Sequence, residues 1–451
     1  MQIIIVGCGN VGVTLAEQLN SEGHNITVID VNNQKLENLV NSSDVMGVVG
    51  NGASFAVQKE ADVEHADLLI AVTGSDEMNL LCCLIARKTG GCNTIARVRN
   101  PIYNMEIGYI KEELGLSMVI NPEFAASAEM ARLLKFPSAI TIDTFSKGRV
   151  EMVKYRVTED SILCDLSLKE ISSRLKSDVL ICSVERGEDV YIPGGNFIIR
   201  AKDEISILGT PQKKMAFFKR LGAAVTSAKS AMIIGGGECS FYLAKQLIAM
   251  GIAVKIIEID KSRCDELSEL LPEALIINGD GTDRNLLMEE GLRQAEAFVA
   301  LTNVDEENIM LSLFAKSVTK AKLITNVHRI SYDEIINSLD IGSVVYPKYI
   351  TAELILQYVR AMDNSLGSNI ESLYRLHDNR TEALEFIVKE DSPVVGVPLQ
   401  NLSLKPNLLI CSINHKGMIT IPGGQSVIQV GDTVVIITTN TGLHDIKDIL
   451  K

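Results

Sequence analysis

Residues 1–30 read MQIIIVGCGNVGVTLAEQLNSEGHNITVID, and this stretch decides the fold. A GxGxxG sequence, Gly7 to Gly12, directly follows the apolar strand pattern Ile3–Val6 and opens the amphipathic segment Val11–Leu19. A strand, a glycine-rich turn and a helix in this order are typical of a dinucleotide-binding Rossmann unit. The sequence therefore predicts a nucleotide site at its own beginning.

The glycine turn carries most of that prediction. Gly7 permits a tight turn, Gly9 lets a pyrophosphate approach the backbone, and Gly12 allows the helix to pack closely on the strand. The first turn of the helix offers free N–H groups and the positive end of its dipole to phosphates. The predicted binding residues of this turn are Gly7, Cys8, Gly9, Asn10, Val11 and Gly12.

Asp30 ends the second strand pattern, 18 residues after Gly12 (30 − 12 = 18). A carboxylate there can accept hydrogen bonds from both ribose hydroxyls of an adenosine, and it repels a 2′-phosphate. This favours NAD over NADP. The structural alternative is an aspartate that caps the helix starting near Asn32 and Asn33.

The ends of the later strands should line the same crevice, because parallel sheets bind ligands beyond their carboxyl edge. The candidates are Asn51, Thr73 and Gly74, then Arg97 and Val98. Arginine at this place could neutralise phosphate charge, although a solvent-facing or interface role is equally open. Asp76 and Glu77 are expected to cap the helix that follows.

The chain repeats itself. Residues 230–260 read SAMIIGGGECSFYLAKQLIAMGIAVKIIEID, so Gly235 matches Gly7 and Glu258 matches Asp30, both 228 positions later. AVTGSDEMN at residues 71–79 matches ALTNVDEEN at residues 300–308, an offset of 229. In each half, strands alternate with helices first, and short strands broken by turns follow.

The predicted fold class is α/β, with two tandem Rossmann-like parallel-sheet domains, each followed by a small α+β subdomain. The expected domains are residues 1–136 and 229–362 for the Rossmann-like domains, and residues 137–222 and 363–451 for the small subdomains.

The second copy keeps the frame and changes the details. Gly235, Gly237 and Glu258 are its predicted binding residues, whereas Ser240 replaces the third glycine and Glu238 adds a carboxylate near the phosphates. Three readings stay open for this copy: a bound dinucleotide, an adenosine-type ligand with fewer phosphate contacts, or an empty structural copy.

The composition argues against several classes of protein. The chain has 451 residues and a net charge of −14, which opposes binding to nucleic acid and to anionic lipid. It has no apolar run of about 20 residues and no secretion signal at Met1, so a cytoplasmic protein is expected. Nine cysteines without metal-ligand spacing predict free thiols and no metal site.

Catalytic groups are missing from the pattern. No P-loop and no Ser-His-Asp grouping occurs, and the small subdomains offer no His, Lys or Tyr constellation for acid–base chemistry. We therefore expect a ligand sensor with no catalytic residues. The alternative is an NAD-dependent oxidoreductase with an unidentified substrate, which the cofactor fingerprint alone favours.

The order GCGNVG, Asp30, AVTGSDEMN, ARVRNP and YIPGG, all duplicated, resembles the TrkA family of Trk potassium-uptake regulators. Each half is similar to an RCK (KTN) nucleotide-binding domain followed by a TrkA-C subdomain. The resemblance implies a cytoplasmic subunit, peripheral on the inner face of the cell membrane, that assembles into a homo-oligomeric ring, expected to be a tetramer.

The resemblance also implies a function. Members of the family bind NAD(H), ATP or ADP, and this occupancy gates a membrane potassium-transporter subunit of the Trk type. The nucleotide contacts of the family fall on Gly7 to Val11, Asp30, Asn51, Thr73-Gly74 and Arg97-Val98.

Overall fold

The computed structural model describes residues 1–136, 139–145, 150–175, 179–222, 228–328, 336, 339, 341–364, 370–376, 380–389, 392–440, 443 and 445–451. The chain forms two compact units, and each unit takes one part from each copy of the repeat. The first unit comprises Met1–Ala131 and Ala228–Leu356, and the second comprises Arg132–Ser227 and Gln357–Lys451. Residue 137, the predicted start of the first small subdomain, lies outside the described residues.

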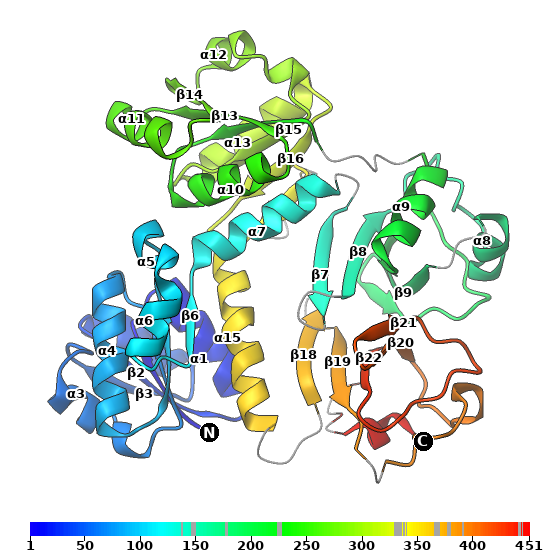
Figure 1. Ribbon diagram of the computed structural model, residues 1–451, viewed down its shortest axis with the longest axis horizontal. Coiled ribbons are helices and arrows are strands. Elements are labelled where there is room, and N and C mark those ends of the chain that lie inside the picture. The colour runs from blue at the N-terminus through cyan, green and yellow to red at the C-terminus, as the bar shows by residue number, and fades with distance from the viewer. Residues whose placement is uncertain are drawn as a thin grey trace. The chain divides into compact units, whose positions relative to one another are not determined.

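The first copy opens with a six-stranded parallel sheet in the order β3-β2-β1-β4-β5-β6 (Figure 1). Its strands are β1 (Gln2–Val6), β2 (Asn25–Asp30), β3 (Met46–Val49), β4 (Leu68–Ala71), β5 (Asn93–Arg97) and β6 (Met118–Ile120). Its helices are α1 (Asn10–Ser21), α2 (Asn33–Ser42), α3 (Phe55–Glu60), α4 (Asp76–Thr89), α5 (Pro101–Met105), α6 (Ile107–Glu113) and α7 (Pro122–Lys135). The strand order reverses between β1 and β4, and such a reversal opens a ligand crevice at the carboxyl ends of the strands.

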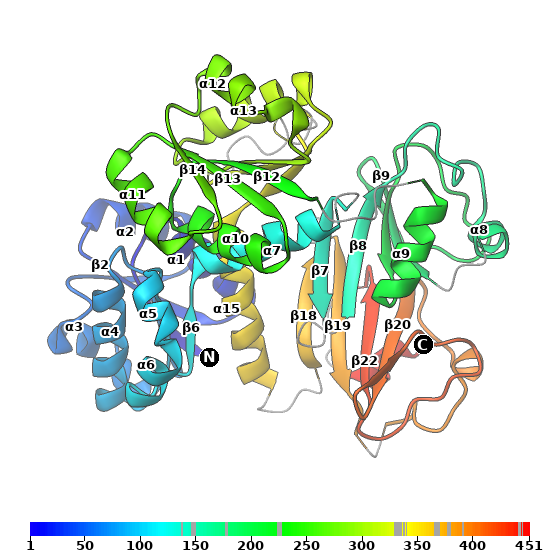
Figure 2. The same ribbon diagram turned by 45° about the horizontal axis from the view of Figure 1, so that its top comes forward.

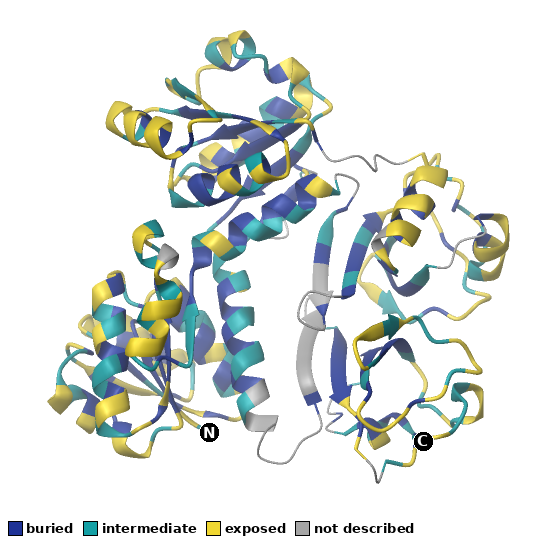
Figure 3. Cartoon of the chain, viewed as in Figure 1, coloured by how far each residue is buried: buried dark blue, intermediate teal, exposed yellow. Residues whose placement is uncertain are grey.

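The second copy repeats this sheet in the order β14-β13-β12-β15-β16-β17. Its strands are β12 (Ser230–Ile234), β13 (Ala253–Glu258), β14 (Leu275–Asn278), β15 (Ala297–Ala300), β16 (Lys322–Asn326) and β17 (Ser343–Val345). Its helices are α10 (Glu238–Ala249), α11 (Lys261–Leu270), α12 (Arg284–Glu289), α13 (Asp305–Val318) and α15 (Pro347–Asn364). In both copies the central strands are buried and the outer helix surfaces are exposed, which explains the continuous apolar runs of the strands (Figure 3).

Helix α7 of the first copy packs against α10 of the second copy (Figures 1 and 2). The rings of Phe124 and Tyr242 meet edge to face with centroids 5.6 Å apart. Nε2 of Gln246 donates a hydrogen bond of 2.8 Å to Oγ of Ser127. The two Rossmann-like domains of the first unit are therefore joined by specific contacts.

The second unit contains two five-stranded antiparallel sheets, in the orders β10-β9-β11-β8-β7 and β18-β19-β22-β20-β21. The elements from the first copy are β7 (Thr141–Phe145), β8 (Val150–Arg156), α8 (Leu168–Leu175), β9 (Leu180–Arg186), β10 (Asp189–Tyr191), β11 (Glu204–Leu208) and α9 (Pro211–Arg220). Those from the second copy are β18 (Ile370–Leu376), β19 (Thr381–Ile387), β20 (Leu408–His415), β21 (Met418–Thr420) and β22 (Thr433–Thr438). The two sheets share one apolar core, to which Met152 and Cys182 contribute from the first copy and Cys411 and Val435 from the second.

These sheets confirm the predicted fold class of two tandem Rossmann-like domains, each followed by a small α+β subdomain. The sequence order did not show that like parts associate across the two copies. None of the helices in the described ranges is both long and apolar enough to cross a membrane.

Candidate functional site

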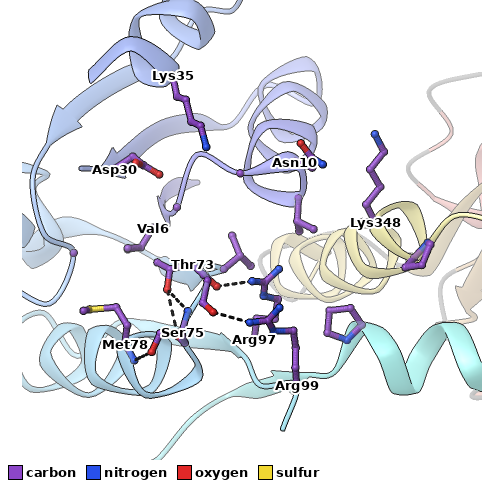
Figure 4. A pocket seen from close by; sticks show the side chains of 18 of the residues that line it. Val6, Asn10, Asp30, Lys35, Thr73, Ser75, Met78, Arg97, Arg99 and Lys348 are labelled. Carbon is purple, nitrogen blue, oxygen red and sulfur yellow. Dashed lines mark hydrogen bonds between the residues drawn. The ribbon is translucent and has the colours of Figure 1, made fainter. Parts of the chain in front are cut away.

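A pocket of about 780 Å³ lies at the carboxyl edge of the first parallel sheet (Figure 4). It brings together nine of the twelve site residues predicted in the first copy. These are Gly7, Gly9, Asn10, Val11, Asp30, Asn51, Thr73, Gly74 and Arg97. The crevice thus forms where the strand order of the sheet reverses.

The glycine turn has the geometry that its three glycines predict. Gly7 has a φ of +110°, and a Cβ there would lie 3.1 Å from the backbone N of Thr73. A Cβ at Gly12 would lie only 1.9 Å from the carbonyl oxygen of Gly7, so the turn and α1 pack without room for a side chain. A Cβ at Gly9 would meet no atom of a described residue within 4 Å, which leaves the approach to its backbone open.

Asp30 is tied to the glycine turn by its carboxylate. The backbone N–H of Cys8 donates a hydrogen bond of 2.5 Å to Oδ2, and the N–H of Asn32 donates one of 2.8 Å to Oδ1. The cap of α2 is Asn32, whose side chain accepts a hydrogen bond from Lys35 N–H, so the capping alternative for Asp30 is wrong. These two hydrogen bonds hold the carboxylate at the lining of the pocket.

Arg97, the last residue of β5, and Arg99, two residues beyond it, are both bound to the loop after β4. Nη2 of Arg97 donates to the carbonyl oxygen of Thr73 at 2.5 Å, and Nη2 of Arg99 donates to that of Gly74 at 2.6 Å. Burial lowers the pKa of Arg97 and raises that of the neighbouring Glu123 carboxyl. Both guanidinium groups line the pocket.

The expected caps of α4 need a correction. Ser75 is the cap, since its side chain accepts a hydrogen bond from Met78 N–H. Oδ2 of Asp76 instead accepts hydrogen bonds from the backbone N–H groups of Arg99 and Asn100, at 2.8 and 2.9 Å. Ser75 has the extended conformation that a cap requires, so the cap position is already filled. The Asp76 carboxylate instead fixes the backbone after β5.

Three predicted residues lie behind the pocket lining. Cys8 contributes its backbone N–H to Asp30, and its thiol is buried. Gly12 packs on Gly7. Val98 is fully buried in the core of the first sheet.

Several lining residues were not among those predicted from the sequence. Lys35, on the first turn of α2, lies near Asp30, and Glu123 is the second residue of α7. The second copy supplies six more lining residues, which are Cys239, Asn303, Asn326, His328, Pro347 and Lys348. Lys35 could have been found from its position five residues after Asp30, on the ligand edge of the sheet.

The predicted residues of the second copy occupy the matching turn after β12. Gly235 has a φ of +99°, and a Cβ at Gly237 would meet no described atom within 4 Å. Oε2 of Glu258 accepts a hydrogen bond of 2.5 Å from Gly236 N–H, as Asp30 does from Cys8. This turn reproduces the backbone frame of the first.

Comparison with known proteins follows the same division. The family model of the TrkA-N domain matches residues 3–122 and 231–347, and that of the TrkA-C domain matches residues 152–222 and 383–451. The chain is 31% identical to the Trk system potassium uptake protein TrkA homolog 1 of Methanosarcina mazei, over 100% of both chains. It is 32% identical to the Trk system potassium uptake protein TrkA of Haemophilus influenzae, over 97% of this chain and 95% of that one.

Among solved structures, the GsuK channel bound to NAD aligns with a TM-score of 0.64 and 18% identity. The alignment covers 97% of this chain and 77% of that chain. At this identity the likeness shows a shared fold.

Proposed function

The chain belongs to the TrkA family of Trk system potassium uptake proteins, and from this premise we propose that it is a nucleotide-binding regulatory subunit of a membrane potassium transporter. The partner would be a Trk-type membrane subunit. The chain itself would form a homo-oligomeric ring, a tetramer, on the inner face of the membrane.

One observation carries the proposal. The first pocket combines an open glycine turn, a fixed carboxylate for a ribose, and four cationic side chains. These cations are Lys35, Arg97, Arg99 and Lys348, and the carboxylates of the pocket are Asp30 and Glu123. An excess of positive charge beside a helix N-terminus suits the phosphates of NAD(H), ATP or ADP.

The pocket also suggests how binding is transmitted. Its walls come from both Rossmann-like domains, so a ligand that contacts both stabilises one arrangement of the two domains over others. Such a ligand shifts the assembly by the difference between its affinities for the two states. We propose sensing without catalysis, in which gating follows from this shift.

The direct test is a calorimetric titration of the full chain with NADH and with ATP. Asp30→Ala should raise the Kd at the first site by about 10- to 100-fold, because charged hydrogen bonds to the ribose are lost. Glu258→Ala, at the matching position of the second copy, is the control and should leave this site unchanged. Unchanged affinity in Asp30→Ala, with the variant folded by circular dichroism, would contradict the assignment.

Regulation needs a second measurement. The chain and a Trk-type membrane subunit are reconstituted together in liposomes, and potassium flux is measured against NADH and ATP. Flux should depend on nucleotide with wild-type protein and lose that dependence with Asp30→Ala. NADH absorbance should stay constant with carbonyl substrates present, whereas turnover would favour an oxidoreductase.

A further inference from the structure

The duplication allows each residue of the first glycine turn to be compared with its counterpart in the second copy. At the offset of 228, Asn10 of the first copy corresponds to Glu238, and Lys35 corresponds to Arg263. Asn10 and Lys35 both line the open pocket. Their counterparts touch each other.

Arg263 lies over the second glycine turn. Its Nε donates a hydrogen bond of 2.7 Å to the carbonyl oxygen of Gly236, and its Nη2 lies 3.3 Å from Oε1 of Glu238. Nη1 is 2.7 Å from a carboxylate oxygen of Glu266 on the same helix. The guanidinium side chain is 18% exposed, so it is held against the turn.

Glu238 is the first residue of α10 and places a carboxylate at the N-terminus of that helix. In the first copy, the same helix end faces the open pocket, with the neutral Asn10 in this position. A side-chain anion at the second helix end competes with a phosphate for the same N–H groups and dipole. Glu238 and Arg263 therefore supply internally the charges that a phosphate and its cation would bring.

The cavity beside Glu238 is rich in carboxylates. Glu238 lines a cavity of about 470 Å³ whose other charged residues are Asp76, Glu77, Arg99 and Glu123. Four carboxylates and one arginine surround this opening, which repels phosphates.

The corresponding helices α7 and α15 carry opposite charges at their second residue. Glu123 follows Pro122 at the start of α7, and Lys348 follows Pro347 at the start of α15. Lys348 lines the first pocket, whereas Glu123 lines both that pocket and the cavity beside Glu238.

We propose that the Glu238–Arg263 pair closes the second glycine turn to nucleotide phosphates, so that each chain binds one nucleotide, in the first copy. This inference rests on the proposed function and selects the empty structural copy among the three readings of the second half. Glu238 and Arg263 are then the residues that make the two sites differ.

The test counts nucleotides per chain by calorimetry on the full-length protein, with NADH and ATP as separate probes. Wild type should bind one of either. Glu238→Asn with Arg263→Lys gives the second copy the residues of the first, and a second, weaker binding event should appear. Asn10→Glu with Lys35→Arg is the matched reverse exchange and should weaken the first site by more than about tenfold.

The outcomes separate the two proposals. Two NADH molecules per wild-type chain, one of which is lost in Glu258→Ala, would overturn this inference and leave the proposed function standing. A single event in the folded Glu238→Asn/Arg263→Lys variant would also overturn it. No binding of NADH or ATP to wild type would overturn the proposed function together with the inference.

Discussion

The hydroxyl of Tyr242, on α10 of the second copy, donates a hydrogen bond of 3.1 Å to the carbonyl oxygen of Arg99, at the first pocket. The same hydroxyl accepts one of 3.0 Å from Nδ2 of Asn121. A buried side chain of the second copy thus fixes the backbone of a residue that lines the site of the first. The pocket depends on both halves of the chain.

Tyr242→Phe should therefore act on stability and binding together. Without the hydroxyl, the Arg99 carbonyl and the Asn121 amide each lose one hydrogen bond. This loss should lower the free energy of unfolding by about 1 kcal/mol. The ring contact with Phe124 remains. We expect a smaller second effect, a rise of about twofold in the Kd for NADH. Urea unfolding measures the change in stability, and calorimetry measures the change in the Kd.

The control for this change is Tyr109→Phe, because Tyr109 is exposed on α6. It should alter neither quantity. Equal stabilities of Tyr242→Phe and wild type would show that the hydroxyl does not join the copies in solution.

Lys348→Met tests whether the second copy contributes to phosphate binding. The substitution keeps an unbranched side chain, one atom shorter, and removes its charge, so the Kd for ATP should rise about five- to tenfold at low salt. The difference from wild type should shrink as ionic strength increases. Lys88→Met, on the exposed last turn of α4, is the matched control. A Kd for ATP unchanged at every salt concentration would remove Lys348 from the site.

The glycine turn allows stability and binding to be separated. Gly12→Ala places a Cβ 1.9 Å from the carbonyl oxygen of Gly7, so we expect a loss of more than about 2 kcal/mol of stability. Gly9→Ala should be nearly neutral, within about 0.5 kcal/mol, because its φ of −85° suits alanine and its Cβ meets no described atom.

Binding should show the reverse contrast at Gly9. The new methyl group occupies the approach to the backbone, so the Kd for NADH should rise more than about tenfold in the stable Gly9→Ala protein. Wild-type affinity in that protein would mean that the pyrophosphate does not approach this turn.

Glu123 should make nucleotide affinity depend on pH. Burial raises the pKa of its carboxyl, and the nearby Arg99 and Arg97 oppose that shift. As the pH falls from 7.5 toward the raised pKa, Glu123 gains a proton and the pocket loses a negative charge. The affinity for NAD⁺, whose diphosphate keeps its charge in this range, should therefore rise on acidification, by about threefold once the carboxyl is protonated.

Glu123→Gln removes the titrating group. It should bind NAD⁺ more tightly than wild type at pH 7.5, and its affinity should gain less on acidification than that of wild type. Wild-type affinity that falls on acidification, or a variant with the wild-type slope, would contradict this role for Glu123.

Local patterns in the sequence were sufficient for the fold and for the part of the site that the first copy's glycine turn and strand ends supply. The glycine turn, Asp30 and the strand ends at Asn51, Thr73 and Arg97 follow from one rule about parallel sheets, so their convergence was predictable. Lys348 was not predictable, because it lies more than 200 residues after the first-copy residues of the pocket and reaches them only through the association of two domains.

The role of Asp76 was missed for a related reason. Sequence position suggested a helix cap, whereas its carboxylate binds backbone N–H groups on the next strand's loop. A capping residue and a loop-fixing residue look alike in sequence, since both are aspartates at a helix start. The partners that distinguish them are fixed by tertiary structure.

Glu123 and Lys348 also show what joining two copies on one chain makes possible. In a dimer of identical polypeptides, a mutation at the second residue of this helix would appear in both subunits. The two nucleotide-binding crevices would then always carry the same charge. Here the halves are synthesised in a fixed one-to-one ratio and cannot exchange partners within the chain. A mutation in one half therefore leaves the other half unchanged. Two openings that were once identical can in this way acquire different charges.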